Sequence, residues 1–264
     1  MRVRSSLALG EDFESVHWGD MEIGGPRHIY RERRIVRFFQ GCSGDRFALE
    51  AGCGSGTLSL KLVARGCQMV SIDLSRGFVN RLYEKVTSSG LQDKLLIVRG
   101  SVTHLPLRQD LFDAVFSGEV LEHIPDDQGA VREYYRVLRS GGTCIITVPC
   151  NPRLWTIADN WAGHCRRYTT RMIEGTFETA GFVIKGIRYW GFPLLNAFHR
   201  LVFVTWVKRA AKKKSAEQIV SSKITKAGVH PFTSKVLSYV FELDSLFGWS
   251  SKFAIGLILK ARKP

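Results

Sequence analysis

The chain lacks a long uninterrupted hydrophobic run. Its longest apolar stretch, residues 191–207, is broken by His199 and Arg200 and is shorter than the roughly 20 apolar residues that cross a bilayer. The apolar stretch near residue 8 is short and soon followed by acidic residues, unlike a secretory signal. These absences predict a cytoplasmic protein with no transmembrane helix.

Paired metal-binding cysteines are also missing. The 264 residues include six cysteines, but these form no CxxC pair and have no companion histidine at zinc-finger spacing. We therefore expect no metal site. A reduced compartment is the simplest setting, with most of the thiols serving as small core residues.

Acidic residues are scarce in the second part of the chain. Residues 1–150 carry 19 Lys/Arg against 18 Asp/Glu, whereas residues 151–264 carry 19 against 6, a net charge of +13. Such a region is typical of proteins that meet an anionic partner or lie at a membrane surface.

From residue 46 onward, short apolar runs alternate with helical periodicity, which is typical of βαβ units and a parallel sheet. Ser75 is expected to cap one of the helices, and Gly141 with Gly142 to end another. About 60 residues separate the last two apolar runs, where we expect a helical insertion. The expected strands are residues 47–51, 69–72, 95–98, 112–116, 143–148, 182–190 and 253–259.

A glycine-rich turn, EAGCGSG at residues 50–56, follows the first expected strand and leads directly into a helix. Glycines let the backbone approach a ligand closely, and a helix N-terminus favours negative charge. Asp73 ends the second strand, 19 residues after Gly54, where its carboxylate can accept both hydroxyls of a ribose. The alternative role for Asp73 is a cap of the following helix.

Two classes of enzyme combine such a turn with an acidic ribose ligand: dinucleotide oxidoreductases and enzymes that use S-adenosylmethionine. The dinucleotide fingerprint GxGxxG needs its last glycine where Thr57 stands, one position after Gly56. Glu50 would be poorly placed near a pyrophosphate but well placed beside the cationic amino acid end of S-adenosylmethionine. The residues favour the second class.

The turn resembles the first motif of class I S-adenosylmethionine-dependent methyltransferases, and further motifs follow in the family's order. SIDLS at 71–75 resembles the ribose motif, FDAVFSGEVLEH at 112–123 the fourth-strand motif, and LRSGG at 138–142 the turn before the fifth strand. The resemblance covers residues 46–150. Within this family, the chain most resembles the methyltransferase type 11/12 group. It implies an α/β fold: a Rossmann-like, doubly wound sheet of seven strands with an antiparallel last strand.

On this resemblance, residues 1–45 are expected to form an N-terminal helical cap. Residues 46–264 are expected to form the methyltransferase domain, with the insertion at 191–250. The resemblance implies S-adenosylmethionine as the cofactor. The residues expected to bind it are Glu50, Gly52, Cys53, Gly54, Gly56, Asp73, Leu74, Ser75, Ser101, Val102, Ser117, Gly118 and Glu119.

Ser101 departs from the family pattern. Many relatives carry an aspartate at this position, which accepts a hydrogen bond from the adenine amino group. A serine hydroxyl can also accept, but as a neutral group it does so less strongly.

The methyl acceptor is expected beyond the carboxyl ends of the fourth and fifth strands. AGHCRRYT at 162–169 resembles a Gly-His-x-Arg-Arg-Tyr segment of bacterial and archaeal enzymes that often act on lipids, quinones or glycans. We predict that His123 and His164 act as catalytic bases. Asp159, Arg166, Arg167 and Tyr168 are predicted to bind the acceptor.

Plainer roles stay open for these residues. His123 fits a packing residue as well as a base, and the two arginines could be solvated while Tyr168 lies in the core. The N-terminal aromatic residues, among them His17, Trp18, His28 and Tyr30, fit either a cover over the cofactor or ordinary helix packing.

The insertion joins apolar faces, among them Leu201 and Trp206, to a basic run at 208–214. Such a helix could lie on an anionic membrane or line a site for a lipid-like acceptor, which would make the protein peripheral at the membrane. It could equally pack on the sheet edge or on a second subunit.

The function expected from these observations is methyl transfer to an oxygen or carbon atom of a small-molecule, lipid-like, quinone or glycan acceptor. Two alternatives come from other classes. One is an NAD(P)-dependent oxidoreductase, and the other is an inactive basic module that binds a membrane or nucleic acid. Nucleic acid is the less expected partner.

Overall fold

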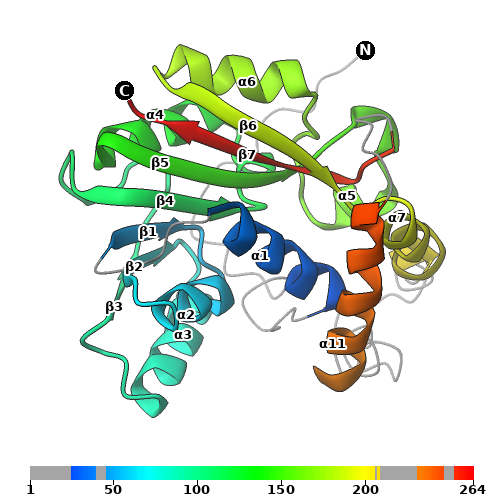
Figure 1. The fold of residues 1–264 in the computed structure, drawn as a ribbon, viewed down its shortest axis with the longest axis horizontal. Helices are drawn as coiled ribbons and strands as arrows, with labels where there is room; N and C mark the ends of the chain where they lie inside the picture. The colour runs from blue at the N-terminus through cyan, green and yellow to red at the C-terminus, as the bar shows by residue number, and fades with distance from the viewer. Residues whose placement is uncertain (1–24, 40–45, 206, 209–230, 247–252) are drawn as a thin grey trace.

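A seven-stranded sheet forms the centre of the molecule (Figure 1), with the strand order β3-β2-β1-β4-β5-β7-β6. The computed structural model describes residues 25–39, 46–205, 207–208, 231–246 and 253–264. The strands are β1 (Phe47–Ala51), β2 (Gln68–Asp73), β3 (Leu95–Arg99), β4 (Phe112–Gly118), β5 (Leu138–Pro149), β6 (Val183–Trp190) and β7 (Gly256–Arg262).

The pairing of the strands confirms the predicted fold class. Strands β1 to β5 pair in parallel, whereas β7 lies antiparallel between β5 and β6. The chain winds outward from β1 to β3 and then crosses to β4 on the other side of β1. In open α/β sheets, ligands bind beyond the carboxyl ends of the strands at such a reversal. The end of β1 and the end of β4 therefore mark the place of the site.

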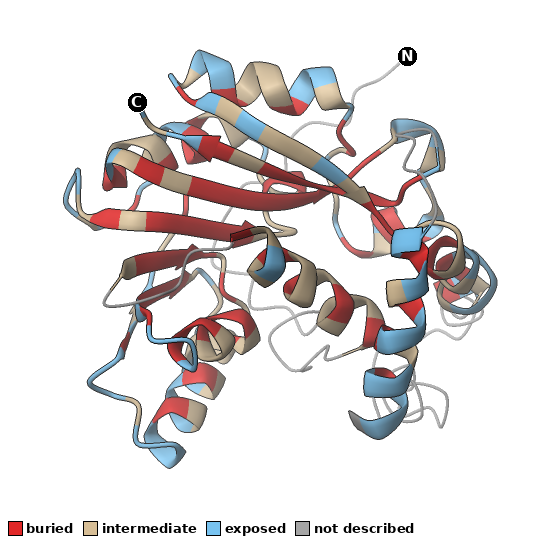
Figure 2. Cartoon of the chain, viewed as in Figure 1, coloured by how far each residue is buried: buried red, intermediate tan, exposed pale blue. Residues whose placement is uncertain are grey.

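Helices cover both faces of the sheet. On one face, α1 (Pro26–Phe39), α2 (Thr57–Val63) and α3 (Arg76–Ser88) bury apolar residues such as Tyr30, Leu62 and Leu82. On the other face, α4 (Asp127–Val137) and α6 (Thr170–Thr179) bury Tyr134 and Phe177. The strands between these layers are mostly buried (Figure 2), which is why they read as continuous apolar runs in the sequence.

Short helices complete the end of the sheet at which β1 and β4 finish. They are η2 (Leu121–His123), η3 (Pro152–Leu154), α5 (Ile157–Trp161), α7 (Leu194–Phe198), η4 (His199–Phe203), α11 (Pro231–Val240) and η5 (Phe241–Leu246). Helix α1 packs against α11 and η5: Arg33 donates to Ser238 Oγ at 3.1 Å and pairs with Glu242 at 3.1 Å. An early and a late segment of the described chain therefore pack against each other. Within the described ranges, no helix is long and apolar enough to span a membrane.

The predicted turn at Gly141 and Gly142 is wrong. Helix α4 ends at Val137, and β5 begins at the next residue, so both glycines lie inside the strand. Gly141 has a φ of 78°, and the register to β4 shifts between Phe112 and Ala114. The glycines thus accommodate an irregularity in the ladder and do not end the helix.

The cysteines agree only in part with the expectation of reduced thiols. Cys53, Cys144, Cys150 and Cys165 are free, and the first three are buried. Cys67, however, is disulfide-bonded. Several other expectations, those on Cys42, His17, Trp18, Trp206 and residues 209–214, lie outside the described residues.

Gly56, the residue before α2, lies against α3. A substitution at Gly56 therefore tests how closely the two helices pack. Its φ is 74°, and a Cβ there would lie 2.2 Å from Cδ1 of the buried Leu82. Gly56→Ala should therefore destabilise the fold by about 1–3 kcal/mol through overpacking, beyond the cost of a left-handed alanine. Urea denaturation followed by circular dichroism measures the free energy of unfolding.

Gly90→Ala is the matched control, because Gly90 has a φ of 65° and a Cβ there would meet nothing within 4 Å. Equal free energies of unfolding for the two variants would contradict the packing described here.

Candidate functional site

Asp73 braces the glycine-rich turn at the end of β1. Its Oδ2 accepts the Gly54 amide at 2.8 Å, and its Oδ1 accepts the Ser75 amide at 2.9 Å. Burial raises the pKa of Asp73, although these two hydrogen bonds act in the opposite direction. Ser75 also caps α3, as predicted, by accepting the Phe78 amide. Of the two roles weighed for Asp73, the helix cap is carried by Ser75, and the binding of ribose hydroxyls stays a prediction.

The turn leaves room for a ligand on one side. Gly52, Gly54 and Gly56 all have a positive φ. A Cβ at Gly52 would collide with Val120, whereas a Cβ at Gly54 would meet nothing within 4 Å. Backbone amides beside open space at a helix N-terminus suit a polar or anionic group, such as the carboxylate of an amino acid.

Glu50 lies deeper than the turn. Its side chain is buried, and its Oε2 accepts a hydrogen bond from Ser59 of α2, which in turn contacts Ser71 at 2.5 Å. Burial raises the pKa of Glu50 to about 8. A nearby ammonium group would favour the ionised carboxylate, which is the chemistry expected of this residue.

The residues predicted to hold the adenosine lie along the ends of β2, β3 and β4. Leu74 is 55% exposed, so its apolar side chain is available to a flat ligand. Val102 is buried, and Ser101 Oγ contacts Thr103 Oγ1 at 2.8 Å. Ser117 is buried and contacts Tyr134 at 3.1 Å, so its side chain is engaged with α4.

Helix α1 contacts α2, the helix that follows the glycine-rich turn, and also the end of β4. His28 Nε2 lies 2.7 Å from Thr57 Oγ1, and Glu32 contacts His28, Thr57 and Lys61. Although burial acts to raise it, the pKa of Glu32 is held far below its usual range by His28 and Lys61.

At its other contact, Arg27 of α1 pairs with Glu119 at 2.6 Å. Glu119 follows β4 with a φ of 59°. The sequence offered no signal for Arg27 or Glu32, because their partners are distant in the chain.

A buried ion pair connects α5 to the segment that follows it. Arg167 donates to Asp159 through Nε at 2.7 Å and Nη2 at 3.1 Å, and both side chains are at most 5% exposed. His164 Nδ1 lies 3.0 Å from the same carboxylate. Burial acts to raise the pKa of Asp159, but His164 and Arg167 outweigh it and hold the pKa well below its usual range.

The neighbouring residues fit neither interpretation completely, whether acceptor binding or solvated arginines beside a core tyrosine. Arg167 is buried, so it is not the solvated arginine of the plainer alternative. Arg166 is partly exposed and pairs with Asp127 at 2.6 Å. Tyr168 is in the core, as that alternative expected, and donates to Asp127 Oδ2 at 2.7 Å.

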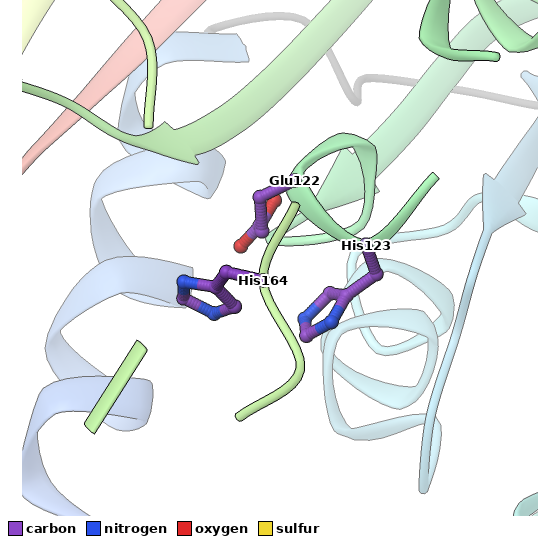
Figure 3. Close-up of side chains that lie close together, drawn as sticks. All are labelled: Glu122, His123 and His164. Carbon is purple, nitrogen blue, oxygen red and sulfur yellow. The ribbon is translucent and has the colours of Figure 1, made fainter. Parts of the chain in front are cut away.

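His123 and His164 lie side by side, with ring centroids 4.8 Å apart and an interplanar angle of 83°. Figure 3 shows the two rings with the Glu122 side chain beside them. Burial, together with His164, lowers the pKa of His123 to about 4, so this imidazole is neutral near pH 7. Burial, together with the nearby Glu119, raises the pKa of Glu122 well above its usual range.

Several buried polar atoms around these residues have no hydrogen-bond partner among the described residues. Such atoms are rare inside proteins and often mark places where water or a ligand binds. They come from α1, the end of β4, η2, β5, β6 and η4, which places one polar region beside the carboxyl ends of β4 and β5. The group includes Arg27 Nε, Arg31 Nε, Glu119 Oε1, both Glu122 oxygens, Thr147 Oγ1, Trp190 Nε1 and His199 Nε2.

The structure therefore places the predicted cofactor and acceptor residues at one end of the sheet, on the two sides of Glu119. Glu122 and His199 were missing from the predicted site. His199 belongs to the insertion. Its pKa is lowered to about 3, mainly by burial and also by the charges of Arg27 and Arg167. That a residue so far along the chain lies near Arg27 could not be read from the sequence.

Known proteins resemble the first part of the chain most clearly. Residues 49–146 match the family model described as a methyltransferase domain. A ubiquinone biosynthesis O-methyltransferase from Psychrobacter cryohalolentis is 31% identical over 143 residues, covering 51% of this chain and 52% of the relative. A demethylmenaquinone methyltransferase from Lactiplantibacillus plantarum is 28% identical over 53% of this chain and 60% of the relative. The chain thus matches little more than half the length of these relatives.

One solved structure resembles the chain over most of its length. It is described as a putative sarcosine dimethylglycine methyltransferase from Galdieria sulphuraria, with a TM-score of 0.65 and 16% sequence identity. The alignment covers 89% of this chain and 86% of that one. This likeness establishes the fold.

The buried Asp159–Arg167 pair gives a direct test of the geometry on the acceptor side. Asp159→Asn should cost about 3–5 kcal/mol of unfolding free energy at pH 7, because it leaves the Arg167 charge buried without its counter-ion. Asp110→Asn is the control: Asp110 pairs with Lys263 at 2.7 Å but is half exposed, so its loss should cost about 1 kcal/mol or less.

The same pair predicts a pH dependence. The folded pKa of Asp159 lies below the unfolded value of about 3.9, so its contribution is complete above that pH and is lost as the pH falls further. The wild type should therefore lose more stability than Asp159→Asn between about pH 4 and pH 2 in urea denaturation. Parallel pH profiles for the two proteins would show that the pair is not formed.

Proposed function

We propose that the protein transfers a methyl group from S-adenosylmethionine to an oxygen or carbon atom of a small-molecule acceptor, because residues 49–146 match a methyltransferase domain and the motifs of this region resemble those of class I S-adenosylmethionine-dependent methyltransferases. The observation that carries the proposal is the glycine-rich turn, braced by Asp73 and open at Gly54, at the reversal of strand order between β1 and β4. Nothing in the comparisons favours the oxidoreductase or the inactive binding module.

The residues around the turn fit the parts of the cofactor by their chemistry. The Gly54 backbone would face the amino acid end, with Glu50 near its ammonium group. The Asp73 carboxylate, whose oxygens each keep a second lone pair, would accept the ribose hydroxyls. Leu74 and Val102 would contact the adenine, with Ser101 and backbone groups as its polar partners.

The cofactor supplies a methyl group on a sulfonium, which an oxygen or carbon nucleophile attacks in line. The chain's own contribution is to position the acceptor and, for a hydroxyl, to take its proton. His164 is suited to this because Asp159 binds its Nδ1 and leaves Nε2 to act as the base. His123 is neutral near pH 7 and offers a second base beside it.

We propose a quinone-like or lipid-like acceptor. The names of the two curated relatives, one for ubiquinone and one for demethylmenaquinone, support a quinone. Large apolar side chains on the segment before β7 support an apolar partner, whether the acceptor's tail or a membrane surface. They include Leu201, Val202, Phe232, Val236, Tyr239, Leu243 and Leu246, all between 45% and 77% exposed.

Cofactor binding is the first test. Gly54→Ala should weaken the binding of S-adenosylhomocysteine at least about tenfold, because its methyl group occupies space at the turn while contacting nothing in the protein itself. Isothermal titration calorimetry measures the dissociation constant, with NADH titrated in parallel.

Gly90→Ala carries the same left-handed strain far from the site and should bind like the wild type. Equal affinity in the two alanine variants would place the ligand elsewhere. Binding of NADH in place of S-adenosylhomocysteine would overturn the proposal.

A further inference from the structure

Glu122, His123 and His164 bring three potential metal ligands together. One ligand atom from each residue lies within 4.8 Å of the others. The first two residues belong to η2, and His164 follows α5, so the cluster joins two segments that are distant in the sequence (Figure 3). Two imidazoles and one carboxylate form a donor set typical of first-row divalent metal ions in sites that keep coordination positions open.

Glu122 gives an independent indication of a missing ligand. Its side chain is 0% exposed, and both of its carboxylate oxygens have no hydrogen-bond partner among the described residues. The other carboxylates nearby are paired, Glu119 with Arg27 and Asp159 with Arg167. A buried carboxyl whose oxygens have no hydrogen-bond partner is costly, and a cation between it and the histidines would stabilise its ionised form.

The two histidines are held in orientations that suit metal binding. Asp159 Oδ1 lies 3.0 Å from His164 Nδ1, so Nε2 is the ring nitrogen left available to a metal ion. Carboxylates commonly bind the far nitrogen of a metal-ligating histidine in this way and fix its tautomer. Asp159 is itself fixed by Arg167, and the His123 ring is hydrogen-bonded to the backbone of Gly163.

We propose that Glu122, His123 and His164 bind a divalent transition-metal ion of the zinc type. Imidazole ligands favour such an ion over magnesium, which prefers oxygen. This proposal replaces our expectation of no metal site, which rested on the cysteines alone. It also makes His123 and His164 ligands, so with the ion bound they no longer act as the catalytic bases predicted from the sequence and used in the proposed function.

A role in the reaction follows, and this part rests on the proposed function. A bound ion with an open position would coordinate the acceptor hydroxyl and lower its pKa, so that its proton leaves to water. The oxygen then forms its bond to the methyl carbon while the sulfur–methyl bond breaks, and that electron pair returns to sulfur. The site therefore favours an oxygen acceptor over a carbon acceptor.

The test is an equilibrium titration with zinc. The full chain, without a histidine tag and stripped with dipicolinate, competes for Zn²⁺ against a chromophoric chelator. We expect one ion per chain, with affinity reduced at least about tenfold in Glu122→Gln and in His164→Asn. His104→Asn, at an exposed histidine, and Cys165→Ser, at an exposed thiol near His123, should bind like the wild type.

A second measurement distinguishes loss of the metal site from misfolding of a variant. Glu122→Gln replaces a buried carboxyl whose oxygens have no hydrogen-bond partner among the described residues, so it should fold about as stably as the metal-free wild type. Zinc should raise the thermal midpoint of the wild type but not that of Glu122→Gln. The visible ligand-field bands of Co²⁺ should appear in the wild type and be lost in the variant.

Two results would overturn the proposal: no stoichiometric zinc binding by the wild type, or equal affinity in Glu122→Gln. These measurements need neither a methyl donor nor an acceptor. S-adenosylhomocysteine binding by the stripped protein is measured separately, so failure of the metal site and failure of the proposed function are distinguishable.

Discussion

The bond between the Asp73 carboxylate and the Gly54 amide is the interaction on which the candidate site depends. It joins the end of β2 to the turn after β1, at the point where the order of the strands reverses. The left-handed backbone of the turn is thereby fixed, and α2 begins beside open space. The proposal for the amino acid and ribose groups of the cofactor follows from this geometry, because it brings the open side of the turn, the N-terminus of α2 and a carboxylate together.

Electrostatics, in contrast, organises the acceptor side. Glu119 at the end of β4 and Asp159 of α5 are buried there with arginines. The Arg27–Glu119 pair joins distant parts of the chain, whereas Asp159 and Arg167 are close in sequence. Glu122 is the exception, since it is fully buried and has no partner among the described residues. Such an imbalance is informative, because folding alone gives no reason to bury a carboxylate in this way.

The sheet was largely predictable because its central strands are mostly buried and read as separate apolar runs. Ser75 was recognised as a helix cap from its local sequence alone. The glycine-rich turn was also recognised from local sequence. The turn at Gly141 was misplaced, because a glycine after a helix gives the same signal whether it ends the helix or permits an irregular strand. The contacts of Glu32 and His199 were beyond prediction, since they depend on how α1 and the insertion pack.

Methyl transfer itself is the most direct test of the account. The protein would be incubated with S-adenosylmethionine labelled with tritium in its methyl group and with a mixture of hydroquinones and lipid extract, followed by separation into aqueous and organic fractions. We predict label in an organic-soluble product for the wild type and Gly90→Ala, and much less label for Gly54→Ala when S-adenosylmethionine is subsaturating. Binding of the cofactor without transfer of label to any fraction would contradict the account and leave a binding protein with a methyltransferase fold.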